Sequence, residues 1–268
     1  MQKLQTIAAA ALGLVAMSHA VAAQDSIRVA TEGAYPPFNY VEADGTVAGF
    51  DVDITEALCE AAGLTCEMVV QAWDGLIPGL LAERYDMIVA AMLITPERAE
   101  VVAFSDRYAT LPQRFVMSEA LADEVDAAPG EGIEQLEAVL EGRVIGLVAA
   151  TASDSYVRDL MGDRATFRSY QQMADAVQDL ISGRIDAYAD AAIGIADTFL
   201  DTPAGEGFRF GGVALTDPDY FGEGTGIAFR QDDDELRERI NAALAQILAD
   251  GTYAEINDRH FSFNVYGE

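Results

Sequence analysis

Short apolar runs alternate with amphipathic segments in the first half of the chain. Residues 26–31 alternate polar and apolar positions, as a strand does, and residues 49–62 carry apolar positions at helical spacing up to Gly63. Further along, the pattern predicts a strand at 66–71, a helix at 73–83 and a fully apolar strand at 87–92. Strands that alternate with helices predict an α/β unit with a mostly parallel sheet flanked by helices.

The same rhythm begins again after a change of composition. Residues 119–132 are acidic and rich in Ala, Pro and Gly, which is typical of a surface excursion. Beyond them we expect strands at 144–148, 165–170 and 187–190, and helices at 153–161 and 172–182. Two α/β units predict two lobes with a cleft between them. Because ligands of open α/β sheets bind beyond the carboxyl ends of the strands, the loops there form the candidate site.

Residues 1–23 have the composition of a cleaved secretory signal peptide. Lys3 precedes an apolar run at residues 7–17, and small residues lead up to Ala23. The run is too short to cross a hydrocarbon core, which needs about 20 residues. We therefore expect cleavage after Ala23 and secretion.

Charge narrows the possible partners. With 45 acidic against 16 basic residues, the net charge is −29 at pH 7. Such a chain repels phosphate backbones, so we expect no nucleic-acid partner. A cationic solute would instead be attracted, although salt screens this attraction beyond about 8–10 Å.

The chain has two cysteines, Cys59 and Cys66. In a secreted protein an even pair separated by a short loop favours a disulfide. Two thiols do not make a structural zinc site, and His260 lies far along the chain. The sequence predicts a disulfide, no metal and no other cofactor.

Two strand-end loops carry candidate binding residues. Glu32 and Tyr35 follow the first expected strand on a proline-rich turn. After the apolar strand, Thr95 suits the cap of a helix and Pro96 its first residue. Free backbone N–H groups at that helix start, together with Arg98, would form a seat for a carboxylate. The alternatives are a solvated surface loop and an ordinary helix cap.

Distinctive segments occur in order along almost the whole chain beyond residue 23. They are ATEGAYPPF (30–38), GFDVD (49–53), WDGLIP (73–78), ITPER (94–98), FS (104–105), YFGEGTG (220–226), DGTY (250–253) and FNVYG (263–267). Together they resemble the bacterial extracellular solute-binding proteins of family 3, the periplasmic amino-acid-binding proteins of ABC transporters. The cysteine pair and the C-terminal ending are similar to the lysine/arginine/ornithine- and histidine-binding receptors. Residues 71–74 and 90–92 resemble instead the nopaline- and octopine-binding branch.

The resemblance implies a two-lobed periplasmic-binding-protein fold of type II with two hinge crossings, near residues 110–113 and 216–224. Residues 24–112 with 217–268 would form the first lobe and residues 113–216 the second. It also implies a monomer in the periplasm that closes around an amino acid or a derivative and delivers it to an inner-membrane ABC permease.

The family's pocket roles can be carried over to positions of this chain. Tyr35 and Trp73 would hold the ligand's aliphatic stem between their rings, whose π faces also attract a cation. Glu32, with Asp51 behind it, would face a guanidinium or ammonium group at the far end of the ligand.

At the other end of the ligand, Arg98 would bind the α-carboxylate. Backbone N–H groups near Ala91 and Leu93, and Thr151 of the second lobe, would assist it. Alanine and leucine replace the serines of basic amino-acid receptors here, so hydroxyl donors are lost. The other expected lining positions are Ala90, Val148 and Ala152.

One departure from the family pattern leaves two classes of ligand possible. The family's aspartate for the α-ammonium aligns with Ala191, whereas Asp190 stands one position earlier, and a slip of one residue on a strand reverses the face of a side chain. Either a local shift brings Asp190 into the cleft and the ligand is a basic amino acid (arginine, ornithine, lysine or histidine), or the α-nitrogen is substituted, as in octopine and nopaline. An unpaired buried ammonium would cost several kcal/mol.

Two further functions are compatible with the resemblance. Some periplasmic relatives are cyclohexadienyl dehydratases, and Glu32 could be proposed as their general acid. The expected cleft has no recognisable catalytic pair, so we expect no enzyme. A receptor that signals to a sensor kinase is the second alternative.

Overall fold

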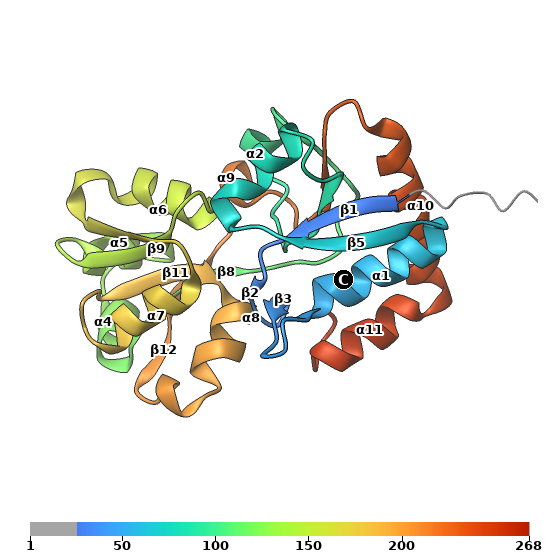
Figure 1. The fold of residues 1–268 in the computed structure, drawn as a ribbon. Helices are drawn as coiled ribbons and strands as arrows, with labels where there is room; N and C mark the ends of the chain where they lie inside the picture. The colour runs from blue at the N-terminus through green and yellow to red at the C-terminus, as the bar shows by residue number, and fades with distance from the viewer. Residues whose placement is uncertain (1–25, 268) are drawn as a thin grey trace, which may run out of the picture.

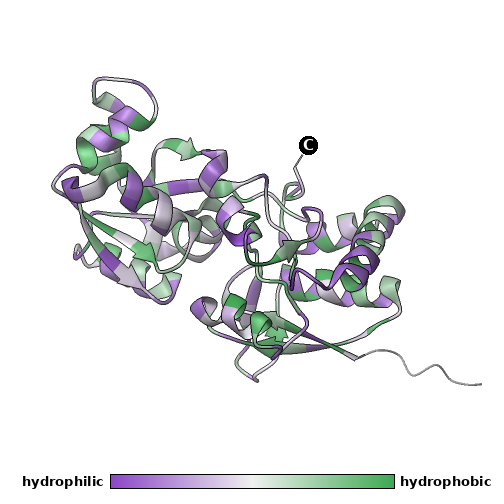
Figure 2. Cartoon of the chain, turned by 90° about the horizontal axis from the view of Figure 1, so that it is seen from above, coloured by the Kyte–Doolittle hydropathy of each residue, from purple (hydrophilic) through white to green (hydrophobic). Residues whose placement is uncertain are grey.

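A computed structural model gives the structure of the protein and describes residues 26–267. The expected signal peptide, residues 1–23, lies outside the described residues. The described chain forms two lobes (Figure 1), each built on a five-stranded sheet. Seen from above, hydrophobic residues gather on the strands inside each lobe (Figure 2). Within residues 26–267, no helix is both long and apolar enough to cross a membrane.

The first lobe contains a mixed sheet. Its strand order is β5-β1-β6-β13-β7, in which β1 pairs parallel with β5 and β6, and β13 pairs antiparallel with β6 and β7. The strands are β1 (Ser26–Thr31), β5 (Thr65–Val70), β6 (Met87–Ile88), β7 (Ala103–Phe104) and β13 (Ala228–Phe229), with a small separate sheet of β2 (Ala34–Tyr35), β3 (Asn39–Val41) and β4 (Val47–Ala48).

Helices cover both faces of this sheet. One apolar cluster joins it to α1, α10 and α11, and another joins its opposite face to α2. The first-lobe helices are α1 (Phe50–Ala62), α2 (Leu76–Leu81), α3 (Pro96–Ala99), α10 (Asp234–Asp250) and α11 (Thr252–His260). The predicted disulfide is confirmed: Cys59 of α1 is bonded to Cys66 of β5. It fixes the end of the helix to the neighbouring strand.

The second lobe repeats this arrangement. In the order β10-β9-β11-β8-β12, the pairs of β9 with β10 and β11 are parallel, and those of β8 with β11 and β12 are antiparallel. The strands are β8 (Gln113–Ser118), β9 (Val144–Val148), β10 (Thr166–Tyr170), β11 (Ala187–Ala191) and β12 (Phe208–Leu215). The helices are α4 (Glu119–Ala127), α5 (Ile133–Leu140), α6 (Ala152–Met161), α7 (Met173–Ile181) and α8 (Ala192–Ile195).

The chain passes between the sheets twice. It leaves the first sheet after Phe104 and enters the second at Gln113, then returns between Leu215 and Ala228 by way of α9 (Pro218–Phe221). The lobe boundaries predicted from the sequence, after residues 112 and 216, fall within these two stretches and stay a prediction.

The α/β class and the two-lobed fold are confirmed, with local differences. Each sheet is mixed, because one strand, β13 in the first lobe and β8 in the second, runs antiparallel to both of its neighbours. The expected excursion at 119–132 contains α4, whose start is capped by the Ser118 side chain accepting from the Leu121 N–H. The helix expected at 73–83 is a tight turn over Trp73–Gly75 followed by α2. These differences leave the strand-end loops in place.

Candidate ligand-binding site between the lobes

Loops from both lobes meet at a pocket between the two sheets. In the first lobe β1 ends just before Glu32, β5 shortly before Trp73, and β6 shortly before Ala90. In the second lobe β9 leads to Thr151, and β11 ends at Ala191. The pocket is lined by Glu32, Tyr35, Trp73, Ala90, Ala91, Leu93, Arg98, Leu111, Gln113, Val148, Thr151, Ala152, Met173, Asp190 and Ala191. Carboxyl ends of parallel strands thus face one another across the cleft.

The structure brings together all of the expected site residues except Asp51, which does not line the pocket. Three lining residues were not expected: Leu111 and Gln113 on the first crossing and Met173 at the start of α7. Ala191 also lines the pocket, beside Asp190.

The two lobes are closed on each other by hydrogen bonds. The Tyr35 hydroxyl donates to the Asp190 carboxylate at 3.2 Å. The Trp73 indole N–H and an Arg98 Nη2–H both donate to the carbonyl of Ala150, at 3.1 and 3.2 Å. Because the donors belong to the first lobe and the acceptors to the second, these bonds stabilise the closed form.

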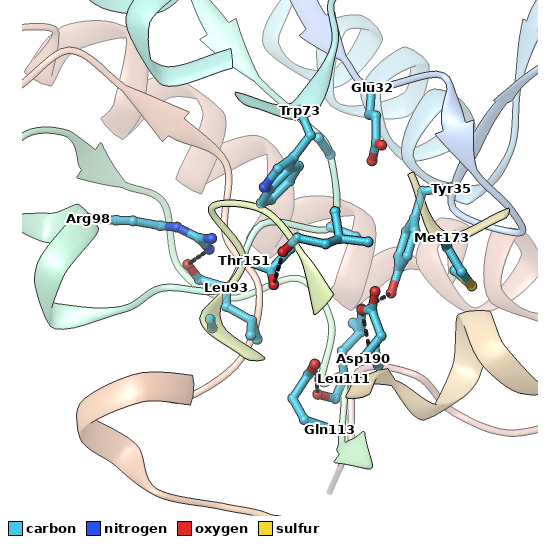
Figure 3. Close-up of a pocket in the computed structure, with 15 residues that line it drawn as sticks. Glu32, Tyr35, Trp73, Leu93, Arg98, Leu111, Gln113, Thr151, Met173 and Asp190 are labelled. Atoms are coloured by element: carbon cyan, nitrogen blue, oxygen red, sulfur yellow. Dashed lines mark hydrogen bonds between the residues drawn. The ribbon is translucent and has the colours of Figure 1, made fainter. Parts of the chain in front are cut away.

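Two aromatic side chains and one carboxyl group define one end of the pocket. Figure 3 shows the Glu32 carboxyl group pointing toward the space between the Trp73 and Tyr35 rings. Such a site suits an aliphatic stem that ends in a cation, since the rings exclude water and attract positive charge.

Arg98 reaches the pocket from α3, and its local structure is the one expected. The Thr95 Oγ1 accepts from the Arg98 backbone N–H at 3.2 Å, and Pro96 is the first helical residue. The Arg98 Nη1 donates to the Leu93 carbonyl at 3.0 Å, and the guanidinium carbon lies 5.2 Å from the Trp73 ring centre. A guanidinium has five N–H donors, so these bonds leave others for a ligand carboxylate.

Two donors expected for the ligand are already used within the protein. The Ala91 N–H donates to the Tyr108 hydroxyl oxygen at 2.9 Å. The Thr151 hydroxyl donates to the Val148 carbonyl at 2.8 Å and accepts from the Asp154 N–H, so it caps α6. Both residues line the pocket, but these bonds hold its walls together.

Asp190 lies in the pocket, although it precedes the position that aligns with the family's aspartate. Its carboxylate accepts from the hydroxyls of Tyr35 and Tyr188 and from the Ala191 N–H. The strand β11 ends at Ala191, where the backbone turns into α8, so both positions reach the cleft.

Comparison with known proteins decides the family. The profile of the bacterial extracellular solute-binding proteins, family 3, matches residues 27–263. The chain belongs to this family.

Relatives of this solute-binding protein have names that refer to basic amino acids. The L-arginine-binding protein of Pseudomonas aeruginosa is 40% identical over 100% of this chain and 99% of its own length. The lysine/arginine/ornithine-binding periplasmic protein of Escherichia coli is 32% identical over 96% and 95%. Among solved structures, an arginine-specific periplasmic binding protein of Salmonella typhimurium has a TM-score of 0.77 and 29% identity, and the match covers 89% of this chain and 100% of that one.

Burial controls the electrostatics of the solute-binding protein's cleft. Burial, and then the charge of Asp190, raises the pKa of Glu32 to about 7. Burial also raises the pKa of Asp190, although its three hydrogen bonds oppose the shift. The pKa of Arg98 falls to about 10 because the guanidinium is buried, which the charge of Glu97 partly opposes. Two acidic groups therefore share a buried site, and among residues 26–267 neither of them forms an ion pair, so a cationic ligand would supply the opposite charge.

Asp51 lies behind the pocket wall of the solute-binding protein, in the first turn of α1. It is fully buried, and its two carboxylate oxygens accept from the Tyr108 hydroxyl and from the Asn39 amide, each at 2.7 Å. Burial raises its pKa to about 7 against the effect of these bonds. The sequence could not separate Asp51 from Glu32, because the family resemblance assigns both acids to the distal end of the ligand, and the tertiary structure decides which of them lines the pocket.

Proposed function

We propose that this solute-binding protein captures a basic amino acid, with arginine as the favoured ligand, by closing its lobes around it. The observation that carries the proposal is the Asp190 carboxylate in the pocket, 3.2 Å from the Tyr35 hydroxyl. A buried carboxylate at this point can pair with a free α-ammonium, whose burial without a partner would cost several kcal/mol.

Charge balance supports the same class of ligand. The charged side chains of the described lining are Glu32, Asp190 and Arg98. Two carboxylates and one guanidinium leave one negative charge, which a basic amino acid with net charge +1 balances. An opine adds at least one carboxylate to the amino acid and lowers its net charge accordingly.

This assignment gives each charged residue of the pocket a partner on the ligand. Arg98 binds the α-carboxylate, Asp190 binds the α-ammonium, and Glu32 binds the distal cation between Tyr35 and Trp73. The 40% identity to an L-arginine-binding protein over the whole chain agrees with it. In this proposal the acidic groups bind and do not catalyse.

Ligand binding and closure of the two lobes are coupled in this proposal. Contacts to both lobes bind the ligand more strongly in the closed form than in the open one, so the ligand shifts the population toward closure. We further propose that the monomer acts in the periplasm and presents the closed surface to an ABC permease.

Ligand binding can be tested with the purified protein by calorimetry and thermal denaturation against arginine, ornithine, lysine, histidine, octopine and nopaline. A ligand at 100 times its Kd should stabilise the folded state by about 2.7 kcal/mol. Arginine should give the largest shift. Stabilisation by an opine alone would overturn the assignment, and turnover of prephenate or arogenate would replace it with an enzymatic function.

Asp190→Asn tests the residue that carries the proposal. Removing one partner of a buried charge pair costs at least about 2 kcal/mol, so the affinity for arginine should fall by at least about thirtyfold. The matched control is Asp201→Asn, an exposed aspartate that does not line the pocket. Equal affinities of the two variants would contradict the role of Asp190.

A further inference from the structure

Asp51 is a buried acid that the proposed binding mode does not use. None of its side chain is exposed, and it does not line the pocket. Its carboxylate accepts hydrogen bonds from the Tyr108 hydroxyl and the Asn39 Nδ2–H. The two donors come from different segments of the first lobe, so Asp51 joins them.

The direction of each hydrogen bond is fixed by a backbone group. The Gly33 N–H donates to the Asn39 Oδ1 at 2.8 Å, which turns the amide N–H of Asn39 toward Asp51. The Ala91 N–H donates to the Tyr108 oxygen at 2.9 Å, which leaves the hydroxyl proton for Asp51. The group between these two donors must offer an acceptor atom to each of them, and a carboxylate does so with its two oxygens.

The two backbone groups belong to the two main binding loops of the first lobe. Gly33 lies between Glu32 and Tyr35, and Ala91 lines the pocket between Ala90 and Leu93. Both have left-handed backbone conformations, with φ of 72° at Gly33 and 47° at Ala91. For an alanine this conformation is unfavourable, so the surrounding structure must hold it.

We propose that Asp51 is a positioning residue, which fixes the backbones of both binding loops through Asn39 and Tyr108 and makes no contact with the ligand. The binding test of this inference rests on the proposed function, because it uses arginine as the probe. It assigns Asp51 a different role from the ligand contact expected from the family resemblance.

Asp51→Asn separates the two roles when arginine is compared with citrulline, an analogue of similar shape whose side chain ends in a neutral urea group. The variant places an amide N–H against one of the two donors, so the network breaks on that side and the loop it holds loses its support. A positioning role predicts about a tenfold loss of affinity, the same for arginine and citrulline. A direct contact with the distal cation predicts a loss for arginine and little change for citrulline, which would overturn the proposal.

Glu32→Gln is the matched comparison, since Glu32 faces the distal end of the ligand. This variant should lose affinity selectively for arginine. Tyr108→Phe is a second test within the network, because it removes the hydroxyl that bridges Ala91 and Asp51 and leaves the pocket-lining residues unchanged. Tyr108→Phe should reduce the affinities for arginine and citrulline by the same factor. The double variant Asp51→Asn with Tyr108→Phe should lose less affinity than the product of the two single losses. Unchanged affinity in Tyr108→Phe would overturn the proposal.

Amide hydrogen exchange tests the network without any ligand. The N–H groups of Gly33 and Ala91 are both hydrogen-bonded. At least one of them should exchange faster in Asp51→Asn, and that of Ala91 should exchange faster in Tyr108→Phe. Unchanged exchange at both groups would overturn the inference. If the unaltered protein binds neither arginine nor citrulline, the proposed function fails while this measurement still decides the role of Asp51.

Discussion

The indole N–H of Trp73, in the first lobe, donates a hydrogen bond of 3.1 Å to the carbonyl of Ala150 in the second. The same oxygen accepts from Arg98 at 3.2 Å. One carbonyl therefore receives two donors across the cleft, and both donors also line the ligand pocket. Closure and ligand recognition thus depend on the same side chains.

Replacing Trp73 by phenylalanine keeps an aromatic face and removes the N–H donor. A hydrogen bond contributes about 1 kcal/mol net, so the variant should bind arginine about fivefold more weakly. Small-angle scattering should show a larger radius of gyration at subsaturating ligand. Tyr40→Phe, in β3 and outside the pocket lining, serves as control and should bind like the unaltered protein. Equal affinities of the two variants would contradict a role of the Trp73–Ala150 hydrogen bond in ligand binding.

Gly222 lets the return crossing pack closely against the backbone of the loop that carries Leu93. A Cβ atom added there would lie 1.7 Å from the Ile94 carbonyl oxygen, and φ is 59°. Gly222→Ala should destabilise the fold by about 2–4 kcal/mol, since overpacking and the left-handed backbone both oppose alanine. Gly207→Ala isolates the backbone contribution, because φ there is 84° and no atom lies within 4 Å of the added Cβ. Urea denaturation should therefore give a clearly larger loss at Gly222, and equal losses would contradict this interpretation.

Ala150 itself has a left-handed backbone with φ of 61°. Glycine adopts this conformation without the steric cost, which is about 1–2 kcal/mol for other residues, but it loses more entropy on folding. Ala150→Gly should therefore stabilise the protein by up to about 1 kcal/mol in thermal denaturation. Ala149→Gly, at the neighbouring position, should destabilise it. A loss of stability in both variants would show that the backbone is not strained at Ala150.

Glu32 makes stability and ligand affinity depend on pH in opposite directions. Its pKa is raised from 4.5 to about 7 in the folded protein, so its contribution to stability is complete below about pH 4.5 and is lost as the pH rises through 7. A cationic ligand binds the ionised form, so affinity for arginine should increase from pH 5.5 to 8. Calorimetry across this range should show the increase, and Glu32→Gln should make the profile flatter. An unchanged slope in that variant would assign the pH dependence to other groups, of which Asp190 is the nearest in the cleft.

The sequence predicted the parts of the fold that have a clear period. The parallel strands and the long helix α1 were recognised because apolar residues recur at strand or helix spacing. Two-residue strands such as β7 and β13 have no period to detect, so the antiparallel pairs that β13 makes with β6 and β7 were not predicted. The helix α4 was missed because its acidic composition obscures three buried residues, Leu121, Ala122 and Val125.

The candidate site was predicted where family motifs mark strand ends, and missed elsewhere. Leu111 and Gln113 lie on a hinge crossing, and Met173 starts a helix that only the folded second lobe brings to the cleft. The position of Asp190 could not be decided from register alone, because β11 ends at the next residue and the backbone turns there. The bonding of the Ala91 N–H to Tyr108 involves residues 17 positions apart and needs the tertiary structure.

Trp73 is the sole tryptophan of the chain, and it lies in the interlobe cleft with its N–H bonded to the opposite lobe. Indole emission responds to the polarity and hydrogen bonding around the ring. The protein therefore contains an intrinsic optical reporter at the point where its lobes meet, so opening and closing can be followed in real time without attaching a dye.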